Sequence, residues 1–129
     1  MPTYKAPVDD TLFILNDVLQ MERYNNLPGF EDASPDMVEA ILRETGRFCE
    51  EELQPINLSG DQEGCVRNDD GSVTTPKGFK QAFEQFAELG MIGMACDPDY
   101  GGQGLPYVLN AHPANTPQQR TWRGPCIRA

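Results

Sequence analysis

The sequence predicts an all-α domain with one small β-hairpin and a disordered C-terminal tail. Three stretches carry apolar residues at helical spacing, and two of them begin with a proline directly after a capping residue. A glycine-containing turn separates two short β-prone runs between the second and third stretches. The 129 residues suffice for one domain. Because the composition changes after Asn110, we expect residues 1–110 to form the domain and residues 111–129 to form the tail.

The first predicted helix follows an extended arm, residues 1–7, that contains two prolines. Asp9 or Asp10 can cap the helix, and we expect it to end near Met21. A stripe this broad needs cover from more than one side. Its apolar residues are Leu12, Ile14, Leu15, Val18, Leu19 and Met21.

The second helix has a clear start signal in Ser34 at the N-cap and Pro35 at the first helical position. We expect it to end near Leu53, because the residue before Pro55 disfavours helical backbone. Three consecutive glutamates, residues 50–52, would then lie at the negative end of the helix dipole, where acidic side chains are unfavourable.

A hairpin is predicted where residues 65–67 and 72–74 flank a turn at 68–71. Two strands alone are marginally stable, so we expect the hairpin to pack on another part of the molecule. Thr75-Pro76 predicts the start of a third helix, and Gly90 its end. Its apolar face consists of Phe79, Ala82, Phe83, Phe86 and Ala87.

Residues 97–106 form a glycine-rich loop after a short apolar run at 91–95. Three glycines in four positions permit left-handed backbone and close approach by another group. The spacing differs from that of phosphate-binding loops, so we predict no phosphate cradle. The residues alone leave two interpretations open: a tight turn that closes the helical domain, or the lining of a cleft.

The net charge of −10, from 10 basic and 20 acidic residues, argues against binding to nucleic acid or to anionic lipid. No apolar run reaches membrane-spanning length, and the N-terminus lacks the apolar core of a signal peptide. The four cysteines form no C-x-x-C pair and His112 has no cysteine partner at zinc spacing, so we predict no metal site. We expect reduced thiols and a cytoplasmic location.

The tail differs in composition from the rest of the chain, since it holds three arginines and no acidic residue. This composition predicts disorder, and a sparse arginine-rich binding segment is the alternative. The abrupt change leads to the hypothesis that residues 111–129 are out of frame relative to an ancestral coding sequence. Sequencing the downstream DNA tests this hypothesis. If no downstream reading frame continues the sequence pattern of residues 1–110, the hypothesis is wrong.

Several short motifs in combination resemble the N-terminal domain of acyl-CoA dehydrogenases, in the long-subunit bacterial branch that includes the methylmercaptopropionyl-CoA dehydrogenase-like proteins. The resemblance covers about residues 1–110 and is specific only when the motifs are taken together. The matching stretches are Tyr4-Lys5-Ala6-Pro7, Phe13-Ile14-Leu15-Asn16, Glu51-Glu52-Leu53-Gln54-Pro55, Gly60-Asp61-Gln62-Glu63-Gly64, Thr75-Pro76-Lys77-Gly78-Phe79-Lys80, Leu89-Gly90-Met91-Ile92-Gly93 and Pro98-Asp99-Tyr100-Gly101-Gly102-Gln103-Gly104-Leu105-Pro106.

The resemblance implies an FAD-dependent enzyme that oxidises an acyl-CoA to the 2,3-enoyl-CoA, with a glutamate removing the α-proton and FAD taking the β-hydride. It also implies a homo-oligomer and an electron-transfer partner. In that family the N-terminal helical domain helps wall the acyl pocket and the flavin cleft. The candidate residues of the substrate-cleft wall are then Tyr100, Gly101, Gly102, Gly104 and Leu105.

The chain also departs from the family pattern. Its 129 residues stop before the regions that carry the flavin contacts and the catalytic base, so we assign no catalytic residue and expect the chain alone to be inactive and flavin-free. Met91 stands where this branch commonly has tryptophan. The alternative function is a stand-alone acidic helical module that binds a partner protein. Exposed apolar surface on the first or third helix and on residues 91–96 would favour the enzyme piece, and polar cover there the module.

Overall fold

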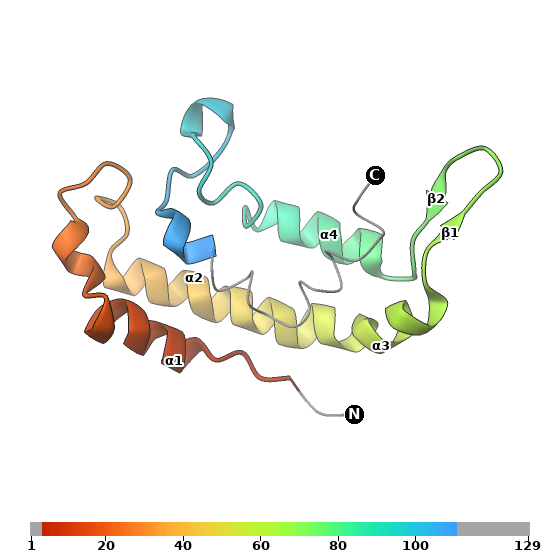
Figure 1. Ribbon diagram of the computed structural model, residues 1–129, viewed down its shortest axis with the longest axis horizontal. Coiled ribbons are helices and arrows are strands. Elements are labelled where there is room, and N and C mark those ends of the chain that lie inside the picture. The colour runs from red at the N-terminus through yellow and green to blue at the C-terminus, as the bar shows by residue number, and fades with distance from the viewer. Residues whose placement is uncertain (1–3, 111–129) are drawn as a thin grey trace.

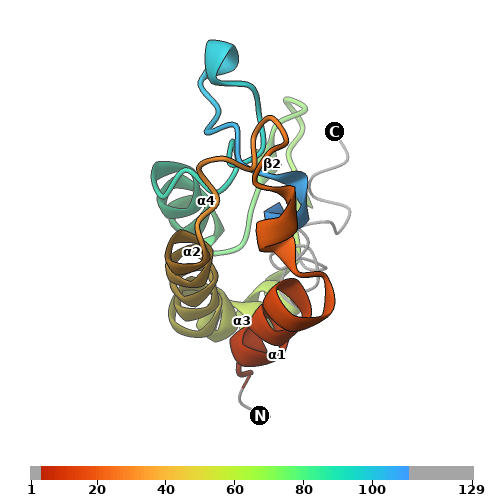
Figure 2. The same cartoon turned by 90° about the vertical axis from the view of Figure 1, so that its left-hand side faces the viewer.

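The computed structural model describes residues 4–110. A long helical rod made of α2 (Pro35–Phe48) and α3 (Gln54–Glu63) runs through the middle of the molecule. Helix α1 (Val8–Phe13) lies along one side of the rod and α4 (Phe79–Glu88) along the other (Figure 1). The view from the end of the rod shows the same arrangement (Figure 2). The mainly helical fold predicted from the sequence is confirmed.

The first predicted helix is present but is not a regular α-helix throughout. Helix α1 continues into a π-helical turn, Ile14–Val18, and ends before Met21. Gln20 stops it with left-handed backbone at φ 51°, and a 3₁₀ turn, Met21–Tyr24, follows. The side chains of residues 14–24 therefore do not keep the spacing of about 3.6 residues on which the predicted stripe depended.

The start of α2 is confirmed, because the Ser34 side chain accepts a hydrogen bond from the Met37 amide at 3.3 Å. The predicted end near Leu53 is wrong. A π-helical turn, Cys49–Leu53, joins α2 directly to α3. The proline at 55 falls in the first turn of α3, directly after the π-helical turn, so its missing N–H interrupts the helical bonding where that turn has already changed the pattern.

The long rod also removes the difficulty of the three glutamates at 50–52. They lie in the middle of the rod rather than at its negative end, because the helical path continues to Glu63. One of them holds the N-terminal arm: the Ala6 amide donates a hydrogen bond to Oε1 of Glu50 at 2.7 Å. Figure 1 shows this arm running beside the rod.

The predicted start of the third helix at Thr75-Pro76 is also wrong. Helix α4 begins at Phe79, and the N-cap is Gly78 with left-handed backbone at φ 85°. The chain turns sharply into the helix at this glycine, so the proline lies in the turn before it, where its carbonyl accepts from the Phe79 amide. The predicted C-terminal glycine is confirmed, with Gly90 at φ 71°.

Two glycines in the rod allow the flanking segments to approach closely. A Cβ built at Gly60 would overlap the ring of Phe79, and one built at Gly46 would lie 2.9 Å from the Cβ of Ala6. The core fills the space between these segments. Its most deeply buried side chains are Val38, Leu42, Thr45, Cys49 and Leu109.

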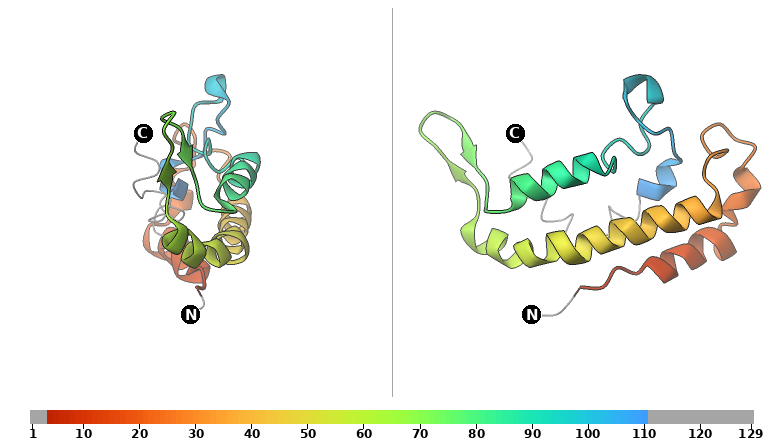
Figure 3. Two further views of the ribbon diagram at one scale, coloured as in Figure 1. Left: turned by 90° about the vertical axis from the view of Figure 1, so that its right-hand side faces the viewer. Right: turned by 180° about the vertical axis from the view of Figure 1, so that it is seen from behind.

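The predicted hairpin is confirmed as β1 (Val66–Arg67) paired antiparallel with β2 (Val73–Thr74). The expected packing on another part of the molecule is not found within residues 4–110, where Val66 and Val73 are each about half exposed and the hairpin projects beyond the end of the rod (Figure 3). Polar bonds stabilise it instead. The side-chain amide of Asn68 donates to Ser72 Oγ at 2.8 Å and to Thr74 Oγ1 at 3.0 Å.

The thiols differ in state. Cys49 is buried and Cys96 is free and exposed, whereas Cys65 is disulfide-bonded. The expectation of reduced thiols is therefore wrong for Cys65, because the absence of C-x-x-C spacing excludes only pairs that are close in sequence. The predictions of a disordered, frameshifted tail at 111–129 lie outside the described residues.

Candidate functional site

The glycine-rich loop folds back on the apolar run that precedes it. Four successive backbone amides, from Gly102 to Leu105, donate hydrogen bonds of 2.9–3.1 Å to carbonyls of residues 93–97. The backbone geometry requires the glycines: Gly101 and Gly104 have φ of 83° and 66°, and a Cβ at Gly102 would overlap the carbonyl of Cys96. The loop is thus a tightly bonded turn, as one of the two sequence interpretations predicts.

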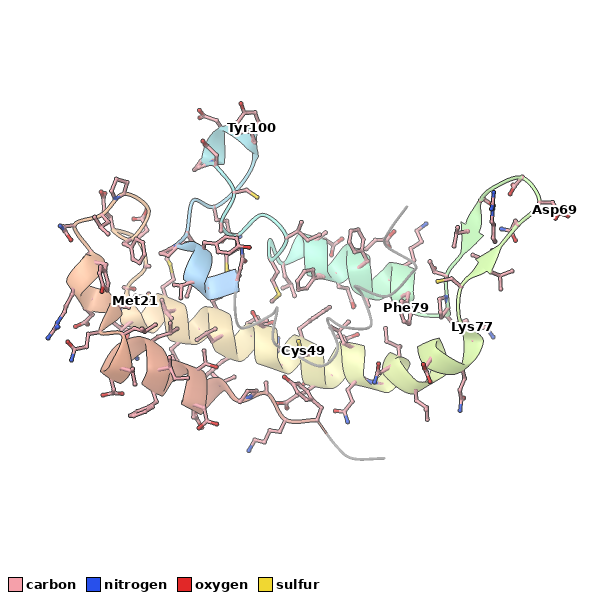
Figure 4. The ribbon with its side chains drawn as sticks, viewed as in Figure 1. Met21, Cys49, Asp69, Lys77, Phe79 and Tyr100 are labelled. Carbon is pink, nitrogen blue, oxygen red and sulfur yellow. The ribbon has the colours of Figure 1, made fainter. Side chains whose placement is uncertain are left out.

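The five candidate wall residues do not share one face. Tyr100 lies at the loop tip, 89% exposed, at the end of a 3₁₀ turn that the Asp97 carboxylate caps through the Asp99 amide at 2.9 Å (Figure 4). Leu105 is buried in the core at 7% exposure. The three glycines between them shape the backbone. A ligand can therefore contact Tyr100 directly, whereas Leu105 anchors the loop.

The amides of residues 102–105 are not available to a phosphate, because they are bonded to carbonyls of residues 93–97. The Gly101 amide likewise donates to the Pro98 carbonyl at 3.0 Å. A further bond ties the loop to α4, since Nε2 of Gln103 donates to the Gly90 carbonyl at 3.1 Å. Phosphate cradles need free amides that point outward, so this loop does not have the chemistry of one.

A groove of about 290 Å³ lies between the rod and α4, and sequence reasoning missed it. The buried Phe48 forms its floor, and the ring of Phe86 stands 5.6 Å behind that of Phe48. The only signal in the sequence that could have indicated the groove was the set of glutamates Glu51, Glu52 and Glu88, which line it. The groove is lined by Glu44, Arg47, Phe48, Glu51, Glu52, Gln85, Glu88 and Leu89.

Neither place fits FAD by itself. The groove has four carboxylates against one guanidinium, which repels the diphosphate of a flavin dinucleotide or of coenzyme A. The amides of residues 102–105 are bonded to carbonyls of residues 93–97. Within residues 4–110, no group of three or more His, Cys, Asp or Glu side chains is arranged to hold a metal ion. We therefore assign no catalytic, flavin-binding or metal-binding role to a described residue from geometry alone.

The N-terminal arm contributes one strongly perturbed group. Burial raises the pKa of the Tyr4 phenol to about 12, and the nearby Cys49 and Glu50 raise it further by disfavouring a second negative charge. The phenol oxygen is buried and has no hydrogen-bond partner among residues 4–110. Tyr4 therefore stays neutral at physiological pH and acts as a packing residue.

Apolar surface is exposed on the elements that the enzyme-piece hypothesis named. Part of the first helix's stripe is uncovered, and so are parts of α4 and of the run that follows it, although Met91 and Met94 are buried. Such surface is typical of an interaction face rather than of a free monomer surface. The side chains, each 44–61% exposed, are Phe13, Ile14, Val18, Leu19, Phe83, Leu89 and Ile92. In residues 4–110, no helix combines the length and the hydropathy that crossing a bilayer demands.

The fold defines the class: a mainly helical domain with a projecting hairpin and a glycine-rich loop after its last helix. Residues 35–114 match the family described as acyl-CoA dehydrogenase, N-terminal domain. The match spans more than half of the chain, so the chain belongs to the acyl-CoA dehydrogenase family, as the motifs predicted.

Three curated relatives agree with this assignment. A 3-methylmercaptopropionyl-CoA dehydrogenase of Ruegeria pomeroyi is 37% identical over 109 residues, which are 84% of this chain and 18% of the relative. A butyryl-CoA dehydrogenase of Syntrophomonas wolfei is 30% identical over 75% of the chain and 15% of the relative. A broad-specificity linear acyl-CoA dehydrogenase of Mycobacterium tuberculosis is 27% identical over 88% and 20%. The chain thus spans no more than a fifth of the length of these relatives.

Proposed function

We propose that this chain forms one wall of the acyl-CoA and flavin cleft of an FAD-dependent acyl-CoA dehydrogenase. The observation that carries the proposal is the combination of family membership with apolar surface left open on α1, α4 and residues 91–96. The alternative of a stand-alone module needs polar cover on these faces. Residues 1–110 would be the structural unit, and its location the cytoplasm.

In the proposed enzyme, FAD held by other regions of the protein would supply the hydride acceptor. The described residues supply shape rather than reacting groups. The loop holds Tyr100 outward on a backbone that its own hydrogen bonds fix, so the ring can lie against an acyl chain without ordering a flexible segment. The catalytic glutamate and the flavin contacts would come from other regions of the enzyme, which would be homo-oligomeric and would pass electrons to a partner.

The names of the relatives suggest substrates for the test. The thioesters 3-methylmercaptopropionyl-CoA and butyryl-CoA have short acyl groups, and we propose that the wall serves acyl chains of this class. The floor of an acyl pocket limits the length of the acyl chain, and in the proposed enzyme that floor would come from other regions. The residues of this chain would therefore affect how the thioester is held and not how long its acyl chain can be.

A graft tests the proposal. Residues 4–110 replace the aligned segment of the Ruegeria pomeroyi relative, and acceptor reduction is measured with both thioesters. We expect the graft to retain flavin and turnover, and Tyr100→Ala to lower kcat/KM about tenfold, the order expected for losing one apolar contact. Tyr107→Ala is the matched control, since that tyrosine is 81% exposed outside the loop, and should change little. A graft that folds and binds flavin but responds equally to both substitutions contradicts the assigned wall.

A further inference from the structure

We propose that the groove between α2 and α4 is a docking site for a basic peptide segment of a partner protein, in which an apolar side chain is flanked by arginine or lysine. This binding role is separate from the role proposed for the glycine-rich loop, and it does not depend on flavin or acyl-CoA. Three properties of the groove carry the inference: its apolar floor, its unbalanced negative charge and an unsatisfied hydrogen-bond acceptor.

The floor and one wall of the groove are apolar. Phe48 is 5% exposed at the bottom, and the Phe86 ring behind it, at 5.6 Å and a tilt of 38°, holds it in place. Leu89, at the end of α4, is 44% exposed beside it. About 290 Å³ of open volume lies above these side chains. This space suits one apolar side chain inserted between two helices.

The rim carries excess negative charge. The lone guanidinium, that of Arg47, is already engaged by the Glu44 carboxylate at 2.6 Å. This hydrogen bond, the charge of Glu44 and the charge of Glu51 raise the pKa of Arg47. Within residues 4–110, Glu52 and Glu88 have no ion pair to Lys, Arg or His within 4.0 Å. A cationic side chain placed between them would meet uncompensated carboxylates.

A third feature is independent of charge. The side-chain carbonyl oxygen of Gln85, a lining residue, is buried and has no hydrogen-bond donor within the described residues. A buried acceptor without a donor costs free energy, and a guanidinium or a peptide N–H that enters the groove can supply the missing bond. The apolar floor, the acidic rim and the unsatisfied acceptor thus all favour the same ligand, a basic peptide segment with an apolar side chain.

Other occupants fit the groove less well. Nucleotides and coenzyme A bring phosphates, which the carboxylates repel. A second copy of this chain brings a net charge of −10, and the one cation of the groove, Arg47, is already paired with Glu44. A basic peptide matches both the charge and the shape, and long-range attraction to an acidic surface would also speed its association.

The test measures binding of a fluorescent peptide, Arg-Arg-Leu-Arg-Arg, to the 129-residue chain by anisotropy at several salt concentrations. We expect the double variant Glu52→Gln/Glu88→Gln to weaken binding about tenfold, the order expected for two exposed charge contacts. The matched control Glu22→Gln/Glu31→Gln removes the same charge from exposed residues outside the groove and should weaken binding less than about twofold.

Two further arms separate the contributions. A peptide with alanine in place of leucine should bind more weakly to the unchanged chain, because the Phe48 and Leu89 surface then stays open. Deleting residues 111–129 removes three arginines, so any gain in peptide affinity should be small and should disappear at high salt. A gain that persists at high salt would overturn the proposal by showing that the chain's own tail is the occupant. Equal losses in the two double variants, or no binding at low salt, would also overturn it.

Discussion

The side-chain amide of Gln103 donates a hydrogen bond to the backbone carbonyl of Gly90, with 3.1 Å between nitrogen and oxygen. This bond joins the glycine-rich loop to the last turn of α4 and satisfies a carbonyl that the end of the helix leaves open. Gly90 must be a glycine for two reasons: its φ is 71°, and a Cβ would overlap the Gln103 amide. The position of Tyr100 therefore depends on the end of α4.

Removal of this bond should loosen the loop more than the domain. We expect Gln103→Ala to speed hydrogen exchange of the Gly104 and Leu105 amides and to cost about 0.5–1.5 kcal/mol of stability. Hydrogen exchange followed by mass spectrometry or NMR measures the first effect, and urea unfolding the second. Exchange rates that stay at the wild-type value would contradict the tie between loop and helix.

The contact between Gly60 and Phe79 predicts a substitution effect of unusual sign. Alanine for glycine inside a helix normally stabilises by about 1 kcal/mol. Here we expect Gly60→Ala to destabilise by about 1–3 kcal/mol, because the new methyl overlaps the Phe79 ring. The double variant Gly60→Ala/Phe79→Leu should recover part of the loss in thermal or urea unfolding. A stabilised Gly60→Ala variant would show that α3 and α4 are not packed in this way.

The raised pKa of Tyr4 predicts an alkaline transition. The folded chain keeps this phenol neutral up to about pH 12, whereas the unfolded chain ionises it near the ordinary value of 10.0. The arm's contribution to stability is therefore complete below pH 10 and is lost as the pH rises toward 12. Unfolding free energies measured across this range should fall more steeply for the wild type than for Tyr4→Phe.

The same variant checks the unsatisfied hydroxyl. Because the Tyr4 oxygen is buried and has no partner in the described part of the chain, Tyr4→Phe should be neutral or stabilising at pH 7. A loss of more than about 1 kcal/mol would reveal a hydrogen bond to the phenol, since a typical bond contributes about that much.

The uncovered stripe of the first helix predicts dye binding. We expect Phe13→Ser/Val18→Ser to reduce fluorescence of an apolar dye bound to the chain without lowering stability, since both side chains are more than half exposed. Leu15→Ala is the contrasting variant. Its side chain is 4% exposed, so truncation should cost about 2–5 kcal/mol. Unchanged dye fluorescence in the double variant would locate the apolar surface elsewhere.

The sequence predicted the elements whose signals are local. The Ser34 cap, the Gly90 stop and the turn between β1 and β2 each depend on residues close in sequence, and each is confirmed. Predictions failed where distant contacts decide. The π-helical turn carries the rod past Pro55, and Gly78 rather than Thr75 begins α4 because the chain must turn there.

The candidate site shows the same division. The backbone character of the loop glycines followed from their spacing, and φ values of 83° and 66° confirm it for Gly101 and Gly104. The opposite directions of Tyr100 and Leu105 did not follow, because they depend on which carbonyls the loop amides reach. The groove was beyond sequence reasoning, since its lining comes from helices that are distant in sequence.

The flavin content and turnover of the purified 129-residue chain test the central claim most directly. After incubation with FAD and removal of the free cofactor, absorbance measures bound flavin, and reduction of an artificial acceptor with butyryl-CoA measures turnover. A cleft wall that needs other regions of the enzyme should retain no stoichiometric flavin and reduce no acceptor. A yellow protein with one flavin per chain that oxidises the thioester would contradict the account.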